Sequence, residues 1–177
     1  MVGDLYIVAD NIRSIENTGA LFRLTDGVGS RELLLVGITP YPDLLENDRR
    51  RPWLRNQVTQ RLKKTALSGM NAPFKYFDQA ADCLEYLQEI GALVLCVEQT
   101  DCSVDLYNLE MALKSNNVLN EKRQNGIAIV VGHEVEGVSD FFIDNSDLCV
   151  QIPMYGHGKS LNVSVAAGIV AYEVKGL

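Results

Sequence analysis

The most specific pattern in the chain is Ile152-Pro153-Met154-Tyr155-Gly156-His157-Gly158-Lys159-Ser160-Leu161-Asn162-Val163-Ser164. A predicted strand ends at Pro153, because proline has no backbone N–H to donate to a sheet. A loop with two glycines then leads to a helix predicted over Ser160–Val174, which is apolar on nearly all sides. Ser160 suits the N-cap of that helix. The unpaired N–H groups at a helix start and the free carbonyls of a loop can also hold a polar ligand, so this junction is a candidate site.

Short apolar segments alternate with helical patterns before this junction. The segments are rich in Leu, Ile and Val, as buried parallel strands are, and the helices carry apolar stripes. Such alternation predicts an α/β fold with a mostly parallel sheet flanked by helices. We expect residues 1–177 to form one domain without an accessory domain. The predicted strands are Leu5–Ala9, Glu32–Ile38, Phe74–Phe77, Ala92–Glu98, Gly126–Gly132 and Leu148–Ile152, the other helices are Thr18–Gly27 and Gln79–Ile90, and the longest connections are Thr39–Asn56 and Thr100–Asn125.

A second candidate site is Ile129-Val130-Val131-Gly132-His133-Glu134-Val135-Glu136-Gly137-Val138-Ser139. Gly132 and Gly137 suit positions where the backbone closely approaches a ligand or another strand. Glu134 and Glu136 can form a catalytic pair. Neighbouring carboxylates in a loop are, however, more often solvated, and a lone histidine such as His133 is seldom a catalytic base.

A third candidate site is Asn17-Thr18-Gly19-Ala20-Leu21-Phe22-Arg23, which follows the first predicted strand. Asn17 suits a helix N-cap. Arg23 lies six residues further on, about 9 Å along a helix, between two apolar residues. We expect it to be partly desolvated and close to the carboxyl edge of the sheet, where ligands bind in open α/β folds. A single arginine on a helix is more often a surface residue, so this segment indicates little when taken alone.

The glycines of Asp26-Gly27-Val28-Gly29 do not indicate a dinucleotide-binding loop. Such a loop follows a strand and opens a helix, whereas this segment ends a helix and precedes a strand. Glycine at this place is better explained as a helix C-cap.

Positive charge is concentrated in one segment, although the net charge of the chain is −7. Residues 49–77 hold eight of the 16 basic residues and no acidic residue. They also include Trp53, which can stack on a base or anchor a loop. A solvated face is the commoner role of a charge run. The alternative is an RNA-binding surface, for which the candidate residues are Arg49, Arg50, Arg51 and Arg55.

Several functional classes are not expected. No apolar run reaches the roughly 18 residues of a membrane span, and the first residues lack a signal-peptide pattern, so we expect a cytoplasmic protein. The cysteines have neither CxxC spacing nor a histidine at the distance that zinc ligands require. We therefore expect no disulfide and no metal at Cys83, Cys96, Cys102 or Cys149.

Together the three candidate sites resemble the signature motifs of the SpoU/TrmH family of knotted (SPOUT-type) RNA ribose 2′-O-methyltransferases. The first motif of that family contains Asn, Gly and Arg, the second is Gly-x-Glu-x-x-Gly after a strand, and the third pairs Ile-Pro-Met with Ser-Leu-Asn. The resemblance covers nearly the whole chain. The matching residues are Asn17, Gly19 and Arg23, then Gly132, Glu134 and Gly137, then Ile152-Pro153-Met154 and Ser160-Leu161-Asn162.

The resemblance implies a deep trefoil knot near the C-terminus, with S-adenosyl-L-methionine bent into a pocket formed by the knotted loops. It also implies an RNA substrate, tRNA or rRNA, and a homodimer formed through the knot region and the C-terminal helix. The implied cofactor contacts are Gly132, Gly137, Ile152, Met154 and Leu161. The implied lining of the catalytic cleft is Asn17, Arg23, Glu134, Ser160 and Asn162.

Two other functions remain open. A base methyltransferase of another knotted branch would use a carboxylate near the base, and here Arg23 and the Ser-Leu-Asn motif favour the ribose branch. A catalytically idle module that binds the cofactor or RNA fits the acidic net charge, although every motif residue is present. Analogy with small family members favours tRNA over rRNA as the target.

Overall fold

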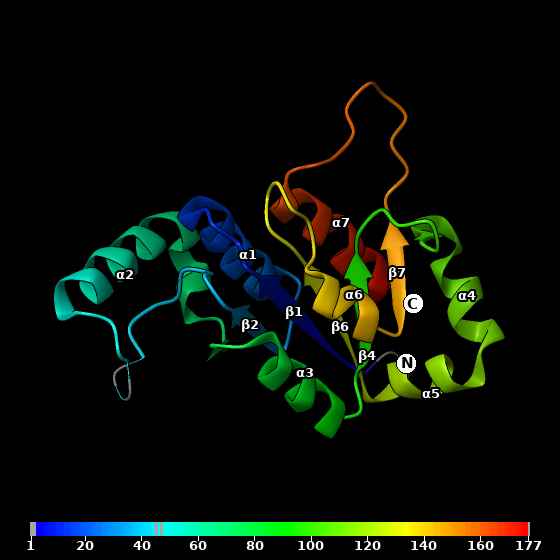
Figure 1. Ribbon diagram of the computed structural model, residues 1–177, viewed down its shortest axis with the longest axis horizontal. Coiled ribbons are helices and arrows are strands. Elements are labelled where there is room, and N and C mark those ends of the chain that lie inside the picture. The colour runs from blue at the N-terminus through cyan, green and yellow to red at the C-terminus, as the bar shows by residue number, and fades with distance from the viewer. Residues whose placement is uncertain (1–2, 45, 47, 177) are drawn as a thin grey trace.

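Seven strands form one sheet within the residues that the structure describes, 3–44, 46 and 48–176 of a computed structural model (Figure 1). The strand order is β3-β2-β1-β6-β4-β7-β5, and every strand pair is parallel. The mostly parallel α/β sheet expected from the sequence is thereby confirmed. The strands are β1 (Asp4–Asp10), β2 (Glu32–Val36), β3 (Phe74–Phe77), β4 (Leu93–Val97), β5 (Val104–Asp105), β6 (Gly126–Val131) and β7 (Leu148–Gln151).

Helices cover both faces of this sheet. On one face α1, α2, α4 and α7 pack in a core with Leu5 and Ile7 of β1. On the other face α3 and α6 pack in a second core with Tyr6 and Val8. Successive residues of a strand point to opposite faces, so strands buried on both sides are apolar throughout. The helices are α1 (Ile15–Gly27), α2 (Pro52–Ala66), α3 (Ala80–Glu89), α4 (Leu109–Ser115), α5 (Asn117–Asn125), α6 (Asp140–Asn145) and α7 (Val163–Lys175), with 3₁₀ turns at Leu67–Asn71 and Leu106–Asn108.

The two longest predicted connections contain regular structure that the sequence analysis missed. Residues 100–125 hold β5, a 3₁₀ turn and the helices α4 and α5, and α2 begins inside the other connection at Pro52. The apolar pattern is weak here because α5 has no buried residue and α2 buries only Leu62 and Ala66. A helix so exposed has no apolar stripe for periodicity to detect. Figure 1 shows α2 at one end of the molecule and α4 and α5 at the other.

A glycine terminates α1, as the sequence indicated. Val28 is the C-cap residue, and Gly29, which follows it, adopts a left-handed conformation with φ of +62°. Glycine is favoured there because it has no Cβ to clash in that conformation.

The strand order places three chain segments at one edge of the sheet. β6 lies between β1 and β4, and β4 pairs in turn with β7. Because all of these strands are parallel, the segments that follow β1, β6 and β7 leave the sheet at the same carboxyl edge. Ligands of open α/β folds bind at such an edge, where the strand order switches direction. None of the helices that the structure describes is long and apolar enough to cross a membrane.

Candidate functional site

Side chains from all three candidate motifs meet at the carboxyl edge of the sheet. Asn17 of α1 donates from Nδ2 to Oε1 of Glu134, which follows β6, over 2.8 Å. Asn162, at the start of α7, donates from Nδ2 to Oδ1 of Asn17 over 3.0 Å. The hydrogen-bonded row Asn162–Asn17–Glu134 therefore connects residues that are up to 145 positions apart in the sequence.

Helix capping differs from the sequence prediction in a way that permits this row. Ser14, not Asn17, caps α1, and its hydroxyl accepts the N–H of Asn17 over 3.1 Å. Asn162, not Ser160, caps α7 and accepts the N–H of Ser164. The Asn17 side chain is thus available for contacts outside its own helix.

Glu134 is a hydrogen-bond acceptor held by the start of α1. Its carboxylate accepts the backbone N–H of Arg13 over 3.0 Å and that of Ser14 over 2.9 Å, in addition to the Asn17 amide. Burial alone would raise the pKa of Glu134, but the hydrogen bonds from Arg13, Asn17 and Ser14 outweigh it and lower the pKa to about 2. Donors that bind the charged form favour that form. Glu134 is therefore anionic at neutral pH and fixes the loop after β6 to α1.

A cavity of about 510 Å³ opens beside this row. Its walls are the ends of β4, β6 and β7, the loops that follow them and the start of α7. Every residue predicted to contact a cofactor lies in its lining, as do Glu134, Ser160 and Asn162 of the predicted catalytic set. The cofactor candidates in the lining are Gly132, Gly137, Ile152, Met154 and Leu161.

The glycines of the loop after β6 are required by its close packing. A Cβ at Gly132 would lie 2.1 Å from the carbonyl oxygen of Gly137 and 2.2 Å from the backbone nitrogen of Val138. Gly137 has a φ of +78°, and a Cβ there would lie 2.3 Å from Oε2 of Glu98. The loop folds back on itself so tightly that only glycine fits at either position.

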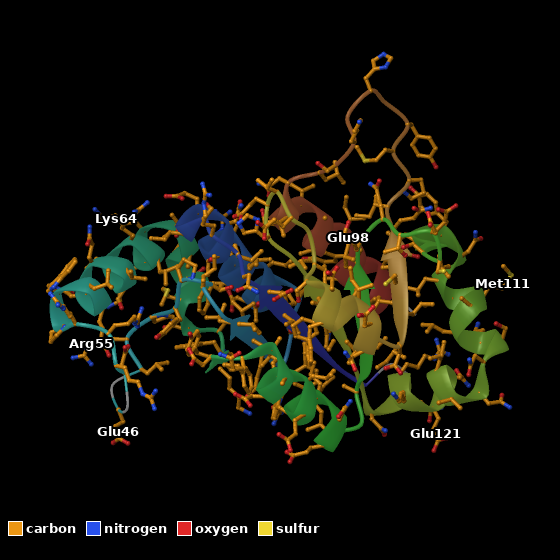
Figure 2. All side chains as sticks on the ribbon, viewed as in Figure 1. Glu46, Arg55, Lys64, Glu98, Met111 and Glu121 are labelled. Atoms are coloured by element: carbon orange, nitrogen blue, oxygen red, sulfur yellow. The ribbon has the colours of Figure 1, made fainter. Side chains whose placement is uncertain are left out.

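Two lining residues, Glu98 and Gln99, were missed by the sequence analysis. Glu98 accepts the N–H of Val138 at Oε2 over 2.9 Å and so connects the end of β4 to the loop after β6. Gln99 donates from Nε2 to the carbonyl of Lys159 over 3.0 Å, which reaches the loop before α7. Figure 2 shows Glu98 above the end of β4. The sequence did contain a signal for these two residues: they are a polar pair directly after a buried apolar strand, at the edge where ligands bind in such folds.

Arg23 lies outside the cavity of its own chain. It is exposed on α1, and among the residues that the structure describes its guanidinium has no hydrogen bond or ion pair. The expectation that it is partly desolvated is therefore wrong. Its helix packs closely on α2 and the following turn: a Cβ at Gly19 would lie 2.0 Å from Oγ1 of Thr65, and one at Gly69 would lie 2.6 Å from Cα of Arg23. Gly19 of the first motif thus serves helix packing.

The four arginines predicted to bind RNA occupy two kinds of environment. Arg50 binds Asp48 over 2.6 Å, donates to the carbonyls of Tyr41 and Pro42, and lies 3.5 Å above the Tyr41 ring. Arg55 pairs with Asp43 over 3.3 Å. Both side chains therefore hold the loop before α2.

The side chains of Arg49 and Arg51 are exposed and make no hydrogen bond or ion pair within the described residues. Trp53 is 62% exposed at the start of the same helix, so it does not anchor the loop by burial. Figure 2 shows Arg55 and Lys64 on α2, far from Met111 on α4. The end of the molecule that carries α2 therefore has exposed cations.

The cavity has the composition of a site for an organic ligand. In the part of the chain that the structure describes, no three His, Cys, Asp or Glu side chains gather as metal ligands would. Its volume falls within the roughly 300–1,000 Å³ typical of small-ligand sites, and its lining combines apolar residues with eight polar or charged ones. Fold and site together define an α/β protein with a cavity of small-ligand size where parallel strands end.

Comparison with known proteins identifies the family. The model of the SpoU rRNA Methylase family matches residues 4–172, and the chain belongs to this family. A tRNA (guanosine(18)-2′-O)-methyltransferase of Aquifex aeolicus is 26% identical over 172 residues, which cover 97% of this chain and 69% of the relative. Staphylococcus aureus relatives assigned to the TrmH family of tRNA/rRNA methyltransferases are 26% identical over 168 residues, 95% of this chain. The chain spans 57% of the length of those relatives.

Solved structures share the fold. The A. aeolicus TrmH/SpoU tRNA modifying enzyme is 26% identical, and the match has a TM-score of 0.67 and covers 97% of this chain and 74% of that chain. An AdoMet-bound rRNA methyltransferase from Sinorhizobium meliloti has a TM-score of 0.72 at 19% identity, covering 99% of this chain and 57% of that chain.

Proposed function

We propose that this chain transfers the methyl group of S-adenosyl-L-methionine to the 2′-hydroxyl of a ribose in tRNA or rRNA. The observation that carries the proposal is that the three motifs meet in space, with the Asn162–Asn17–Glu134 row beside a cavity lined by all predicted cofactor residues. Family membership and the A. aeolicus relative named for 2′-O-methylation of tRNA support it. That the chain works as one domain without a separate RNA-binding domain stays a prediction.

The cavity fits the cofactor in size and chemistry. Gly132, Ile152 and Leu161 would hold the adenosine part through backbone groups, and the backbone packed against Gly132 leaves no room for a side chain there. When bound, the sulfonium supplies an electrophilic methyl group. The task left to the chain is to align the ribose oxygen with it and to stabilise the charge that develops. We also propose that the loops after β6 and β7 form the trefoil knot that the family resemblance implies.

The proton of the ribose hydroxyl needs an acceptor, and neither Glu134 nor Arg23 suits that role. Glu134, with a pKa of about 2, already accepts three hydrogen bonds, so it is a weak base. A guanidinium is already protonated at neutral pH and has no free lone pair with which to accept a proton. We propose instead that Arg23 holds an RNA phosphate and stabilises the negative charge that develops on the ribose oxygen, while the proton passes to a nearby polar group or to water. Ser160 and Asn162 would orient the ribose or hold the loop.

A dimer formed through α7 would place Arg23 near a second cavity. The helix buries Ala167, Val170 and Ala171 against its own chain and exposes a different stripe, of which Val165 is 50%, Ile169 40% and Tyr172 61% exposed. An apolar stripe of this kind suits a self-complementary interface. Because α1 packs against α7, Arg23 would lie at the border of that interface.

Mixing two impaired variants tests this arrangement, at a cofactor concentration near the wild-type Kd. Arg23→Ala removes the arginine, and Gly132→Ala weakens cofactor binding so that its cavity stays nearly empty. If Arg23 serves the partner's cavity, a mixed dimer contains one intact site, and an equal mixture should recover roughly a quarter of wild-type activity by random pairing. If the mixture recovers no activity, Arg23 does not serve the cavity of the partner.

Ribose-specific detection of the product tests the function itself. The protein is incubated with labelled S-adenosylmethionine and tRNA or rRNA from cells that lack it, and the RNA is hydrolysed with alkali. A 2′-O-methylated ribose resists alkaline cleavage, so label should appear in dinucleotides. Label in mononucleotides would indicate base methylation, and cofactor binding without transfer to either RNA would indicate an idle module. An RNA substrate of this kind also leads us to propose a cytoplasmic location.

We propose that Arg49 and Arg51 bind RNA, because these two cations are exposed and unpaired among the described residues. Replacing both with Ala should weaken RNA binding and lower its dependence on salt, by about 0.7–0.9 in log–log slope for each phosphate that is no longer neutralised. An unchanged salt slope would remove them from the RNA surface.

A further inference from the structure

A second hollow lies beside the cofactor cavity and shares part of its wall. Its volume is about 280 Å³, and its lining is Arg13, Ser14, His133, Glu134 and Val135. The last three of these residues also line the larger cavity. The hollow therefore adjoins the proposed site of methyl transfer, and its two other residues come from the segment before α1.

The wall between the two spaces is fixed by hydrogen bonds. Glu134 accepts the backbone N–H groups of Arg13 and Ser14, so the backbone that carries the Arg13 side chain is joined to the loop after β6. Three N–H donors bind the Glu134 carboxylate, so its oxygens already have hydrogen-bond partners. The carboxylate keeps its negative charge, so an anion in the hollow would need a cation beside it.

Two side chains can donate hydrogen bonds into the hollow. The Arg13 side chain is exposed, and its guanidinium has no hydrogen bond or ion pair among the residues that the structure describes. Nδ1 of His133 accepts the backbone N–H groups of Val135 and Glu136, each over 3.2 Å. Because Nδ1 is an acceptor, the neutral ring carries its proton on Nε2, which makes that atom a donor. A guanidinium and an imidazole N–H together match an oxyanion.

We propose that this hollow binds a backbone phosphate of the RNA next to the target ribose, with Arg13 as its cation and His133 as a second donor. The inference rests on the proposed function, since it takes RNA as the substrate. A flanking phosphate held at this wall would fix the position of the nucleotide relative to the cofactor cavity, while Arg49 and Arg51 contact more distant backbone. The same donors could bind the carboxylate of the cofactor instead, and the experiment separates these two anions.

Three variants and one control test the site. Arg13→Gln removes the charge, and Arg13→Lys keeps it without the planar fork of the guanidinium. His133→Asn keeps an acceptor near the position of Nδ1 for the loop N–H groups and removes the Nε2 donor. Arg31→Gln is the matched control, because Arg31 is an exposed arginine whose partner, Asp4, is 4.0 Å away. Thermal unfolding confirms that each variant is folded.

Binding is measured separately for the cofactor product and for RNA. Calorimetry with S-adenosylhomocysteine should give affinities within about twofold of wild type for all variants. Electrophoretic mobility of tRNA and rRNA fragments with S-adenosylhomocysteine present should show at least tenfold weaker binding for Arg13→Gln. The salt slope should fall by about 0.7–0.9, as expected when one phosphate is no longer neutralised. Arg13→Lys should recover part of the affinity, and His133→Asn should weaken binding by a smaller factor.

Two results would overturn the proposal. RNA binding by Arg13→Gln equal to that of Arg31→Gln would show that the hollow holds no phosphate. A loss of S-adenosylhomocysteine affinity as large as the loss of RNA affinity would assign the hollow to the cofactor carboxylate. Since neither assay requires methyl transfer, wild-type protein that binds RNA through Arg13 but methylates nothing would refute the proposed function alone.

Discussion

Replacing Gly132 with alanine is the sharpest test of the cofactor cavity. The new Cβ would lie 2.1 Å from the carbonyl oxygen of Gly137 and 2.2 Å from the nitrogen of Val138, whereas ordinary contacts begin near 3.4 Å. Both neighbours are backbone atoms, so no side-chain rotation can relieve the clash. The loop after β6 must move by more than about 1 Å, and overpacking of this kind costs about 1–3 kcal/mol.

This free-energy cost should weaken cofactor binding, because the loop that moves is a wall of the cavity. A loss of about 2 kcal/mol corresponds to roughly 30-fold weaker binding. Calorimetric titration of S-adenosylmethionine into Gly132→Ala and wild type measures it, with thermal unfolding as a check on the fold. Gly27→Ala is the matched control, since its nearest neighbour would be the Tyr172 hydroxyl at 3.9 Å. A folded Gly132→Ala protein that binds within twofold of wild type would refute the reasoning.

Three further predictions concern a carboxylate, a loop and an interface. Because the folded pKa of Glu134 is lowered to about 2, its ionised form stabilises the protein above about pH 5 and loses that effect as the pH falls through the folded pKa. The stability difference between wild type and Glu134→Gln in urea should therefore shrink from about pH 7 to about pH 3, and a constant difference would contradict this. Arg50→Ala should lower the melting temperature more than Arg49→Ala, because only Arg50 binds Asp48 and the loop carbonyls. Ile169→Glu should yield a monomer by light scattering and Val118→Glu, at an apolar residue of α5 that is 61% exposed, should not; two dimers would exclude α7 from the interface.

The residues of the Asn162–Asn17–Glu134 row were predictable one by one but not as an arrangement. Sequence spacing indicated Asn17, Glu134 and Asn162, yet the preference of Asn and Ser for helix starts left open which residue caps each helix. In the structure Ser14 caps α1 and Asn162 caps α7. Because Asn17 is not a cap, its side chain can bind both Glu134 and Asn162. Capping depends on where the preceding chain enters the helix, which tertiary packing determines.

The charge pattern likewise indicated which residues are basic but not which of them have ion-pair partners. The basic segment was evident, but Arg50 and Arg55 could not be separated from Arg49 and Arg51 by position alone. Their partners, Asp48 and Asp43, precede them in a loop whose shape the sequence does not specify. Glu98 was missed because its role depends on β4 lying next to β6, although the two strands are far apart in the chain.

The sequence by itself determined the alternation of strands and helices, the parallel sheet and the three motifs, because these follow from local apolar periodicity and from fixed residue spacing. Only the tertiary structure decided which residues meet. The strand order brings the ends of β1, β6 and β7 to one edge, places Glu134 against the start of α1 and leaves Arg23 outside its own cavity. The reason is physical: periodicity reports which side of an element is buried, whereas contacts between distant segments arise from how those buried faces pack together.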